Sequence, residues 1–243
     1  MITVVILALN EEECLKETTA TMISAAAAAG NIPLDIIIIN DGSTDRTPQI
    51  IRTLENQYSF VRSIHHAQNK GPGVGVKEAI LIARYPKFIV TPGDNDLSKD
   101  LLAQLFSNKD KADLVLAYYL NMGDRGWFRT CLSNLYTWIY RAAFQISIYY
   151  INSPCLYPTE QLREIQIRSD RFGYSAEMTV KLLRRGCSFL QVGGERRIDD
   201  QNSNALSWKN LKEVASVFLN LIVEIKFFGR RQFNRKPVEV FLS

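Results

Sequence analysis

The chain has 243 residues, of which 47% are hydrophobic and 22% charged, and its formal net charge is +4 from 29 basic and 25 acidic residues. This composition is close to the globular average and excludes a disordered or fibrous chain. The length suits one α/β domain with at most a short appendage. The near balance of charge argues against a dedicated nucleic-acid-binding protein.

The first half of the chain alternates between two kinds of segment. Apolar runs rich in β-branched residues predict strands at 2–9, 34–39, 60–64, 88–91 and 113–118. Between them, helices are predicted at 11–29, 47–57, 73–83 and 98–106. Strands and helices that alternate at this spacing indicate a mostly parallel, Rossmann-like sheet with helices on both faces.

The second half begins with an aromatic and aliphatic stretch at 127–151, and strand and helix patterns resume at 157–167, 175–184 and 188–192. An amphipathic helix is predicted at 208–228, followed by a tail in which five cations lie between Lys226 and Lys236 without an acid. We therefore expect a main domain over 1–205 and an appended helix and basic tail over 206–243. No run of about 18 uncharged apolar residues is present, so a membrane-spanning helix is not expected.

The loops that follow the predicted strands are rich in carboxylates, amides and glycine. In a parallel sheet these loops meet at one edge, where ligands bind. Each loop alone is also typical of an ordinary turn or a helix cap, whereas several together favour a binding site. Four of them share this composition, namely Asn10-Glu11, Asn40-Asp41-Gly42-Ser43-Thr44-Asp45, Asn69-Lys70-Gly71 and Asp94-Asn95-Asp96.

Asp94 and Asp96 carry the sharpest chemical signal. Two carboxylates two residues apart on a tight loop can converge on one hard divalent cation, and Mg²⁺ or Mn²⁺ usually completes its shell with water and substrate phosphates. Neither a dinucleotide fingerprint nor a P-loop is present. The only histidines, His65 and His66, are interpreted as surface or edge residues at the end of a strand.

In this order, the four loops resemble the family 2 glycosyltransferases of GT-A fold, in the branch that contains the polyprenol-phosphate (dolichol-phosphate) mannosyl- and glucosyltransferases. The resemblance covers roughly residues 2–118. Its motifs are Leu7-Ala8-Leu9-Asn10-Glu11, the loop from Asn40 to Thr47, Asn69-Lys70-Gly71-Pro72-Gly73 and Asp94-Asn95-Asp96. Asn40 stands where the family has an Asp that often contacts the base, and Leu7 stands where it usually has Pro.

This resemblance implies an inverting, metal-dependent transfer from a nucleoside-diphosphate sugar, with Mn²⁺ or Mg²⁺ held by Asp94 and Asp96. It implies catalytic roles for Asp96, at the metal and diphosphate, and for Glu177, as the base for a hydroxyl acceptor. It places Arg125 and Arg129 at an acceptor phosphate, and Arg197 and Ser203 in a lid. Expected donor contacts are Ala8, Asn10, Glu11, Asn40, Asp41, Lys70, Gly71, Asp94 and Asn95.

Three readings of the function stay open at this point. The acceptor is a polyprenyl phosphate or another lipid-linked molecule, or it is a sugar hydroxyl of a surface polysaccharide or lipopolysaccharide, or the chain binds nucleotide sugars without catalysis. Glu177 also suits a simple helix-dipole placement, and the two arginines suit a solvated face. We expect a cytoplasmic protein whose C-terminal helix contacts either the inner face of a membrane or a second subunit.

Overall fold

The computed structural model describes residues 1–121, 127–195, 197, 208–229 and 231–242, with the backbone alone at 127–129 and 208–214. Within these residues an eight-stranded sheet has the order β3-β2-β1-β4-β6-β5-β7-β8. Its strands are β1 (Ile2–Ala8), β2 (Leu34–Asp41), β3 (Val61–His66), β4 (Lys87–Pro92), β5 (Leu114–Tyr119), β6 (Cys155–Pro158), β7 (Ser188–Gly194) and β8 (Val238–Val240).

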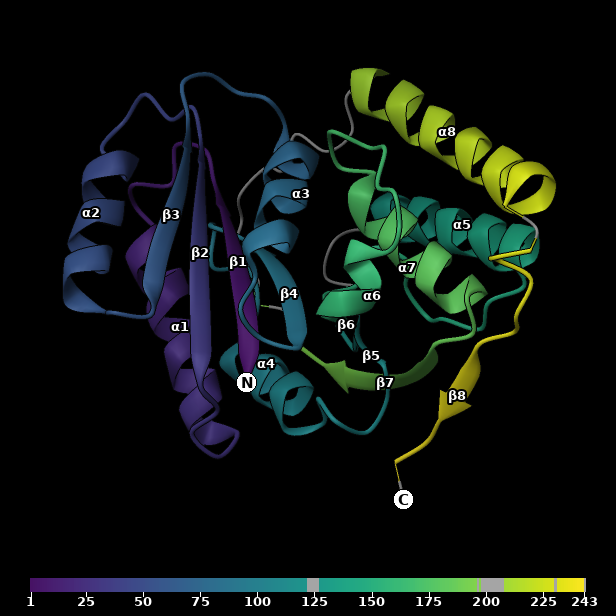
Figure 1. Cartoon of the computed structure of the whole chain (residues 1–243), viewed down its shortest axis with the longest axis horizontal. Coiled ribbons are helices and arrows are strands. Elements are labelled where there is room, and N and C mark those ends of the chain that lie inside the picture. Colours follow the sequence, from purple (N-terminus) through teal and green to yellow (C-terminus); the bar gives the residue numbers. More distant parts are fainter. Residues whose placement is uncertain (122–126, 196, 198–207, 230, 243) are drawn as a thin grey trace.

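Helices cover both faces of this sheet (Figure 1). One hydrophobic core lies beneath α1 (Leu15–Ala28), α2 (Thr47–Gln57) and α4 (Lys99–Ser107). The core on the other face is covered by α3 (Pro72–Ile82), α5 (Trp127–Phe144), α6 (Thr159–Arg163), α7 (Tyr174–Arg184) and α8 (Trp208–Val223). The architecture is therefore a three-layer α/β fold, as the alternating pattern predicts.

The central strands are apolar at most positions because both of their faces are buried. In β2, Ile36 and Ile38 belong to one core while Ile37 and Ile39 belong to the other, and all four side chains are fully buried. In β1, Val4 and Val5 divide between the two cores in the same way. Such continuous apolar runs are typical of parallel strands covered by helices on both sides.

The sheet departs from a purely parallel arrangement at one position. The short strand β6 is inserted between β4 and β5 and pairs antiparallel with both, while β1, β2, β3 and β4 pair in parallel. The helix predicted from residue 11 begins only at Leu15. The preceding residues hydrogen-bond through their backbone N–H groups to side chains of the loop after β2, which holds them in a turn.

The C-terminal segment returns to the sheet. Helix α8 passes into a π-helical turn, η3 (Glu224–Phe228), and β8 then pairs in parallel with β7. Between them Phe233 is buried and its carbonyl accepts a hydrogen bond from Arg184 Nε at 3.0 Å. The basic tail thus contributes the last strand of the sheet, which its composition did not predict. No helix in the described ranges is long and apolar enough to cross a membrane.

Candidate active site

The polar loops after β1, β2 and β4 emerge at the same edge of the sheet. The strand register places Ala8 beside Asn40 and Leu7 beside Pro92, so strands β1, β2 and β4 end at the same level of the sheet. The neighbouring β3 continues this edge, with His65 beside Asn40. The sequence-predicted donor residues are therefore brought together by strand pairing.

The loops after β1 and β2 are locked to each other. Thr44 N donates to Asn10 Oδ1 at 2.8 Å, and Asn10 N donates to Ser43 Oγ at 3.0 Å. Glu11 N donates to Thr47 Oγ1 at 2.9 Å. Asn10 has a φ of 59°, a conformation that Asn tolerates better than most residues. These contacts give the edge of the sheet a fixed shape before any ligand binds.

Asp41 is turned into the protein. Its carboxylate is 7% exposed and accepts hydrogen bonds from Lys70 N and Gly71 N, both at 2.9 Å, and from His66 Nδ1 at 2.7 Å. Burial acts to raise the pKa of Asp41, but these hydrogen bonds and the charge of His66 outweigh it and lower the pKa. Asp41 thereby ties the loop after β2 to the loop that precedes α3.

The histidines are interpreted from the sequence as surface or edge residues, and both lie at the end of the edge strand β3, but His66 is not at the surface. This residue is 6% exposed, and its Nε2 lies 2.9 Å from Glu78 Oε2 on α3. Because a carboxylate can only accept, the ring satisfies both partners when it carries both protons. The parallel register of β2 and β3, which pairs Asp41 with His66, is the signal that could have found this contact. His65 is exposed, and its Nδ1 lies 3.0 Å from Asn40 Nδ2.

Two glycines allow the loops to approach closely. A Cβ on Gly42, which has a φ of 80°, would lie 2.6 Å from the backbone nitrogen of Asn69. A Cβ on Gly71, with a φ of 99°, would lie 2.4 Å from the carbonyl oxygen of Asp170. Only glycine fits such positions without displacing the backbone. Gly71 is therefore buried in a loop contact, whereas Lys70 is exposed, with its Nζ 3.8 Å from Glu78 Oε1.

The loop after β4 presents Asp94 and Asp96 with a buried amide between them. Asp96 N donates to Asp94 Oδ1 at 3.2 Å, which closes the turn. Asn95 has a φ of 57° and is 4% exposed, and neither its Nδ2 nor its Oδ1 has a hydrogen-bond partner in the described part of the chain. A buried amide without a partner is costly, and such groups often mark a site that a ligand completes.

Carboxylates crowd this edge of the sheet. Burial, followed by the nearby charges of Asp94 and Asp45, raises the pKa of Glu11 to about 7. No three metal-binding side chains of the described residues are close enough to form a full ligand set. The donor set thus fits a hard divalent cation held by Asp94 and Asp96, with the remaining ligands supplied by substrate phosphates and water.

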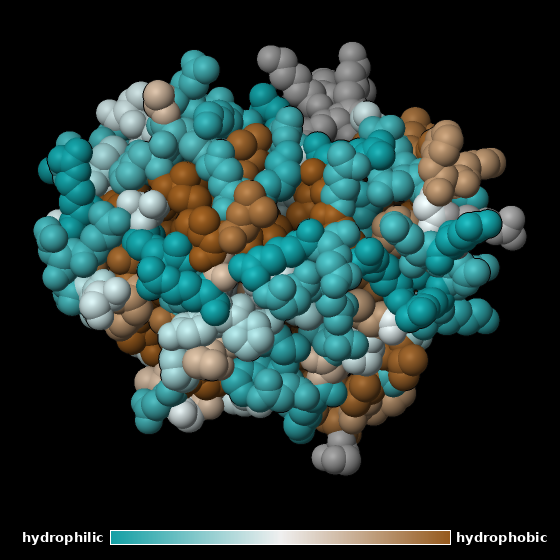
Figure 2. All heavy atoms as spheres, viewed as in Figure 1, coloured by the Kyte–Doolittle hydropathy of each residue, from teal (hydrophilic) through white to brown (hydrophobic). Residues whose placement is uncertain are grey.

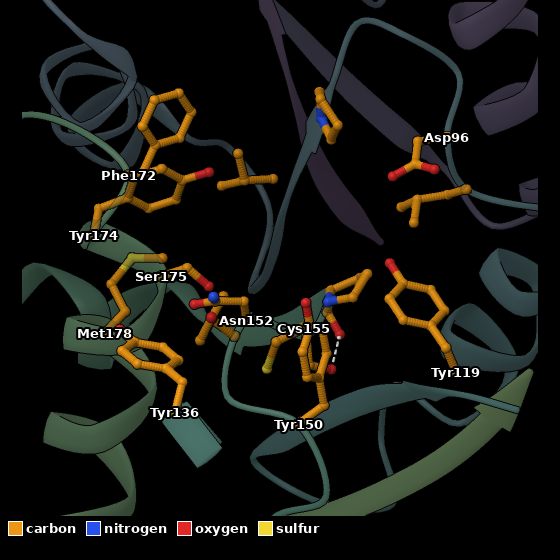
Figure 3. A pocket seen from close by; sticks show the side chains of 16 residues that line it. Asp96, Tyr119, Tyr136, Tyr150, Asn152, Cys155, Phe172, Tyr174, Ser175 and Met178 are labelled. Atoms are coloured by element: carbon orange, nitrogen blue, oxygen red, sulfur yellow. Dashed lines mark hydrogen bonds between the residues drawn. The ribbon is translucent and has the colours of Figure 1, made fainter. Parts of the chain in front are cut away.

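A cavity of about 350 Å³ opens beside Asp96 (Figure 3). Asp96 and Tyr119 lie on one side of it, and Phe172 and Tyr174 lie on the other. Tyr136 of α5 and Tyr150 add further rings to the lining. The pocket next to the paired carboxylates is therefore rich in aromatic side chains, with hydroxyl and amide groups from Ser175 and Asn152. None of these lining residues except Asp96 was among the predicted site residues, because they come from distant segments without a shared motif.

Glu177 lies outside this cavity. It is 3% exposed, and its carboxylate accepts hydrogen bonds from Arg168 N at 3.0 Å and Ser169 N at 2.9 Å. Its Oε1 also lies 2.7 Å from the fully buried Lys181 Nζ, which in turn lies 2.8 Å from Glu224 Oε1. The N–H groups and Lys181 stabilise the carboxylate of Glu177 in a buried ion cluster that does not line the cavity.

The predicted lid and acceptor residues fall largely outside the described residues. Arg197 is described; its backbone N–H donates to Asp96 O at 3.2 Å, and its Nη1 lies 3.0 Å from Glu17 Oε1. It therefore connects the segment after β7 to the carboxylate loop. Arg125 and Ser203 lie outside the described residues, and Arg129 belongs to α5 with its side chain undescribed.

Comparison with known proteins places these loops in a family. The family model Glycosyl transferase family 2 matches residues 3–165, which include β1 to β6 and the Asp94-Asn95-Asp96 loop. The chain belongs to glycosyl transferase family 2. The resemblance inferred from the four loop motifs is thereby confirmed, and so is the identification of the chain as a glycosyltransferase.

A dolichyl-phosphate beta-glucosyltransferase of Trichomonas vaginalis, ALG5D, is 26% identical over 125 residues. This match covers 47% of the present chain and 38% of the relative, so the chain spans well under two thirds of that relative's length.

Glucosyl-3-phosphoglycerate synthase from Mycobacterium tuberculosis has a similar structure. Its complex with Mn²⁺, uridine-diphosphate-glucose and phosphoglyceric acid aligns with a TM-score of 0.69 at 19% identity, covering 91% of this chain and 79% of that one. Its complex with Mg²⁺ and uridine diphosphate gives a TM-score of 0.64 at 18% identity, covering 90% and 78%. At this identity the likeness shows the shared GT-A fold, with its mostly parallel sheet between helical layers.

Proposed function

We propose that this chain transfers a sugar from a nucleoside-diphosphate sugar to a lipid-linked phosphate acceptor at a membrane surface. The observation that carries the proposal is the position of Asp94, Asn95 and Asp96. Their loop lies at the carboxyl edge of a parallel sheet, and Asp96 borders an aromatic cavity of about 350 Å³. The crowded carboxylates and the unpaired amide of Asn95 support the binding of a ligand that brings a cation and polar atoms to this edge.

The donor half of the proposal follows from the charges at this edge. A bound Mn²⁺ or Mg²⁺ would be held by Asp94 and Asp96 and would neutralise charge on the diphosphate as it leaves. The locked loops after β1 and β2 offer Asn10, Glu11 and Asn40 as polar groups beside the nucleoside. The Mycobacterium tuberculosis enzyme, which shares the fold, binds uridine-diphosphate-glucose together with Mn²⁺, and this supports a similar donor here.

The acceptor half depends on the surroundings of Glu177. A sugar hydroxyl needs a base to remove its proton, whereas a phosphate oxygen is already ionised at neutral pH. Glu177 is buried with its carboxylate oxygens bound to N–H groups and to Lys181, and it does not line the cavity. This arrangement favours the phosphate acceptor over the polysaccharide hydroxyl. The partial match to a dolichyl-phosphate beta-glucosyltransferase points the same way.

In the proposed reaction an acceptor phosphate oxygen attacks the anomeric carbon from the face opposite the diphosphate. The bond between that carbon and the diphosphate oxygen breaks, the nucleoside diphosphate leaves with the electron pair, and the configuration inverts. The aromatic side chains of the cavity exclude water from the reacting centre, and Asp96 orients the donor there.

The donor assignment is tested by Asp96→Asn, assayed with uridine-, guanosine-, cytidine- and thymidine-diphosphate sugars in the presence of Mn²⁺ or Mg²⁺. Loss of charge stabilisation at this position should lower kcat by roughly 100-fold or more. Asp100→Asn is the matched control, because Asp100 is an exposed carboxylate four residues further along and outside the cavity. Equal turnover by both variants would contradict the assignment.

The acceptor assignment is tested by offering the wild-type chain three acceptors with its preferred donor: a short-chain polyprenyl phosphate, an oligosaccharide and phosphoglyceric acid. Transfer to the polyprenyl phosphate, with an alkali-stable sugar phosphate diester as product, is the expected result. Transfer to the oligosaccharide or to phosphoglyceric acid alone would overturn the lipid-linked assignment while leaving the donor assignment intact.

A further inference from the structure

Helices α5 and α8 leave a row of large apolar side chains on the outer surface. On α5, Leu135 is 52% exposed and Trp138 is 63% exposed, and on the C-terminal side of α8, Phe227 and Phe228 of η3 are 73% and 86% exposed. We call the whole set the α5/α8 face, defined by Leu132, Leu135, Trp138, Ile139, Leu219, Val223, Phe227 and Phe228. Exposed apolar patches of this kind usually mark an interaction surface.

The two helices are direct neighbours (Figure 1). The ring of Phe218 in α8 lies 5.0 Å from the ring of Tyr140 and 5.7 Å from the ring of Phe144, both in α5. Ala142 of α5 and Lys226 of η3 line the same surface cavity. The inner sides of both helices are therefore used for packing, and the exposed apolar side chains remain outside that contact.

Charge on the described part of this surface is mostly positive, and the one acid in the sequence of α8, Glu213, lies where the side chains are not described. The α5 sequence contains Arg129 and Arg141 but no Asp or Glu. In η3, Glu224 is paired with the buried Lys181, whereas Lys226 is exposed between the apolar side chains. Exposed Arg231 and Lys236 follow in the tail. Figure 2 shows hydrophobic side chains at the end of the molecule that carries α8, with hydrophilic ones below them. Apolar side chains beside unopposed cations are complementary to an anionic lipid surface.

Helix α5 also reaches the candidate site. Tyr136 of α5 lines the cavity beside Asp96, and the exposed Leu132 and Ile139 lie four residues before it and three after it, on the same side of the helix. A bilayer in contact with these exposed side chains would therefore lie within about one helix diameter, roughly 10 Å, of the pocket. A lipid-linked substrate could reach the pocket from this direction without leaving the bilayer.

We propose that the α5/α8 face docks onto an anionic lipid bilayer, with its apolar side chains in the headgroup region and Arg141, Lys226 and the tail cations on the phosphates. This inference rests on the proposed lipid-linked acceptor and names the surface by which the chain would reach it. The partner is the bilayer and not a second copy of the chain, because a self-interface would bring these cations against one another.

The test is flotation of the full chain with phosphatidylcholine vesicles and with vesicles that also contain phosphatidylglycerol. We expect binding to the anionic vesicles that weakens with salt. The double variant Phe227→Ser, Phe228→Ser should bind at least about tenfold more weakly, because two exposed rings no longer enter the interface. Leu81→Ser is the matched control, since Leu81 is 73% exposed on α3 and should leave binding unchanged.

Thermal unfolding of each variant verifies that the fold is intact, as expected for side chains this exposed. Absence of wild-type binding to anionic vesicles, or an equal loss in Leu81→Ser, would overturn the proposal. The proposal would also be overturned if the wild type formed a dimer in sedimentation velocity, the double variant were monomeric, and neither protein bound vesicles.

Transfer to a water-soluble short-chain acceptor phosphate separates this proposal from the function itself. Transfer to the soluble acceptor without vesicle binding would refute the docking surface alone. Vesicle binding without transfer to any acceptor would support the docking surface and refute the proposed function.

Discussion

His66 Nδ1 lies 2.7 Å from Asp41 Oδ1, and the other ring nitrogen of His66 lies 2.9 Å from Glu78 Oε2. The imidazole is therefore held between two carboxylates from β2 and α3. Because Asp41 also binds the backbone N–H groups of Lys70 and Gly71, this contact helps to determine the shape of the loop at the edge where we propose that the donor binds. Asp41 thus acts through the loop that it holds, and the neighbouring Asn40 is buried as well, with 4% of its surface exposed.

Replacement of His66 by Ala should destabilise the protein by about 2–4 kcal/mol, because it leaves a buried carboxylate without its partner. It should also raise KM for the donor more than it lowers kcat, since the loop of Lys70 and Gly71 is released. Urea unfolding and steady-state kinetics measure the two effects. His65→Ala, on the same strand but exposed, is the control and should cost under about 1 kcal/mol. Equal losses in both variants would contradict the role of His66.

Acid should weaken the fold through Asp35. Burial acts to raise the pKa of this carboxyl, but the two hydrogen bonds from Arg62, the N–H of Arg84 and the charge of Arg62 outweigh it and hold the pKa below 3.8. Since the pKa of Asp35 is lower in the folded state than in the unfolded state, its stabilising effect is fully present at pH values above the unfolded-state pKa. This effect is lost as the pH falls through the folded-state pKa.

Asp35→Asn should therefore lower the free energy of unfolding by about 3 kcal/mol at pH 7, because Arg62 loses its buried partner. The difference from the wild type should narrow below pH 3.8 as the native carboxyl is protonated. Urea unfolding of both proteins across this pH range measures the difference in their free energies of unfolding. Glu13→Gln, an exposed acid, should show no such convergence. A constant difference at all pH values would show that the Asp35–Arg62 pair is not the acid-sensitive contact.

Asn95→Gly should leave the ligand-free protein as stable as the wild type, or more stable. Glycine adopts the φ of 57° without strain, and the change removes a buried amide whose desolvation costs about 1–3 kcal/mol. Stabilisation by a nucleoside diphosphate with Mn²⁺ should decrease in a thermal shift assay, because the amide is expected to bind the ligand.

The control for this variant is Asn31→Gly. Asn31 has a φ of 55° but is exposed and far from the site, so its thermal shift with nucleotide should equal that of the wild type. A lower melting temperature for ligand-free Asn95→Gly, with an unchanged nucleotide shift, would contradict a ligand-binding role for this amide.

The variant Glu177→Gln distinguishes two roles of this residue. Glu177 either acts as the general base for a hydroxyl acceptor or stabilises the fold. The amide oxygen of Gln can still accept from the N–H groups of Arg168 and Ser169, so we expect kcat with a phosphate acceptor within about threefold of the wild type. Loss of a general base would instead lower kcat by roughly 100- to 10,000-fold.

Lys181→Met provides the companion measurement. Lys181 is fully buried between Glu177 and Glu224, so its removal should lower the free energy of unfolding by about 3–5 kcal/mol. The double variant with Glu177→Gln should recover part of this loss, because one of the two uncompensated charges is removed. No recovery in the double variant would show that Glu177 and Lys181 are not energetically coupled.

The sequence was sufficient for features that depend on local pattern. The uninterrupted apolar runs at residues 4–7 of β1 and 36–39 of β2 indicate buried parallel strands, and α2 (Thr47–Gln57) lies where the pattern predicts it. Short or isolated features were less predictable. The four residues of β6 and the three of β8 have no repeating pattern, and only pairing with distant strands makes them part of the sheet.

What the sequence determined by itself was the family and the edge of the sheet at which the candidate site lies. Loops with carboxylates and amides follow consecutive buried strands, and parallel strands must place such loops together. Tertiary structure decided what each polar group does, because a carboxylate's role depends on the partners that packing brings to it. Asp41 meets His66 and turns inward, Glu177 pairs with Lys181 one turn further along α7, and Asp96 alone of these carboxylates borders the aromatic cavity.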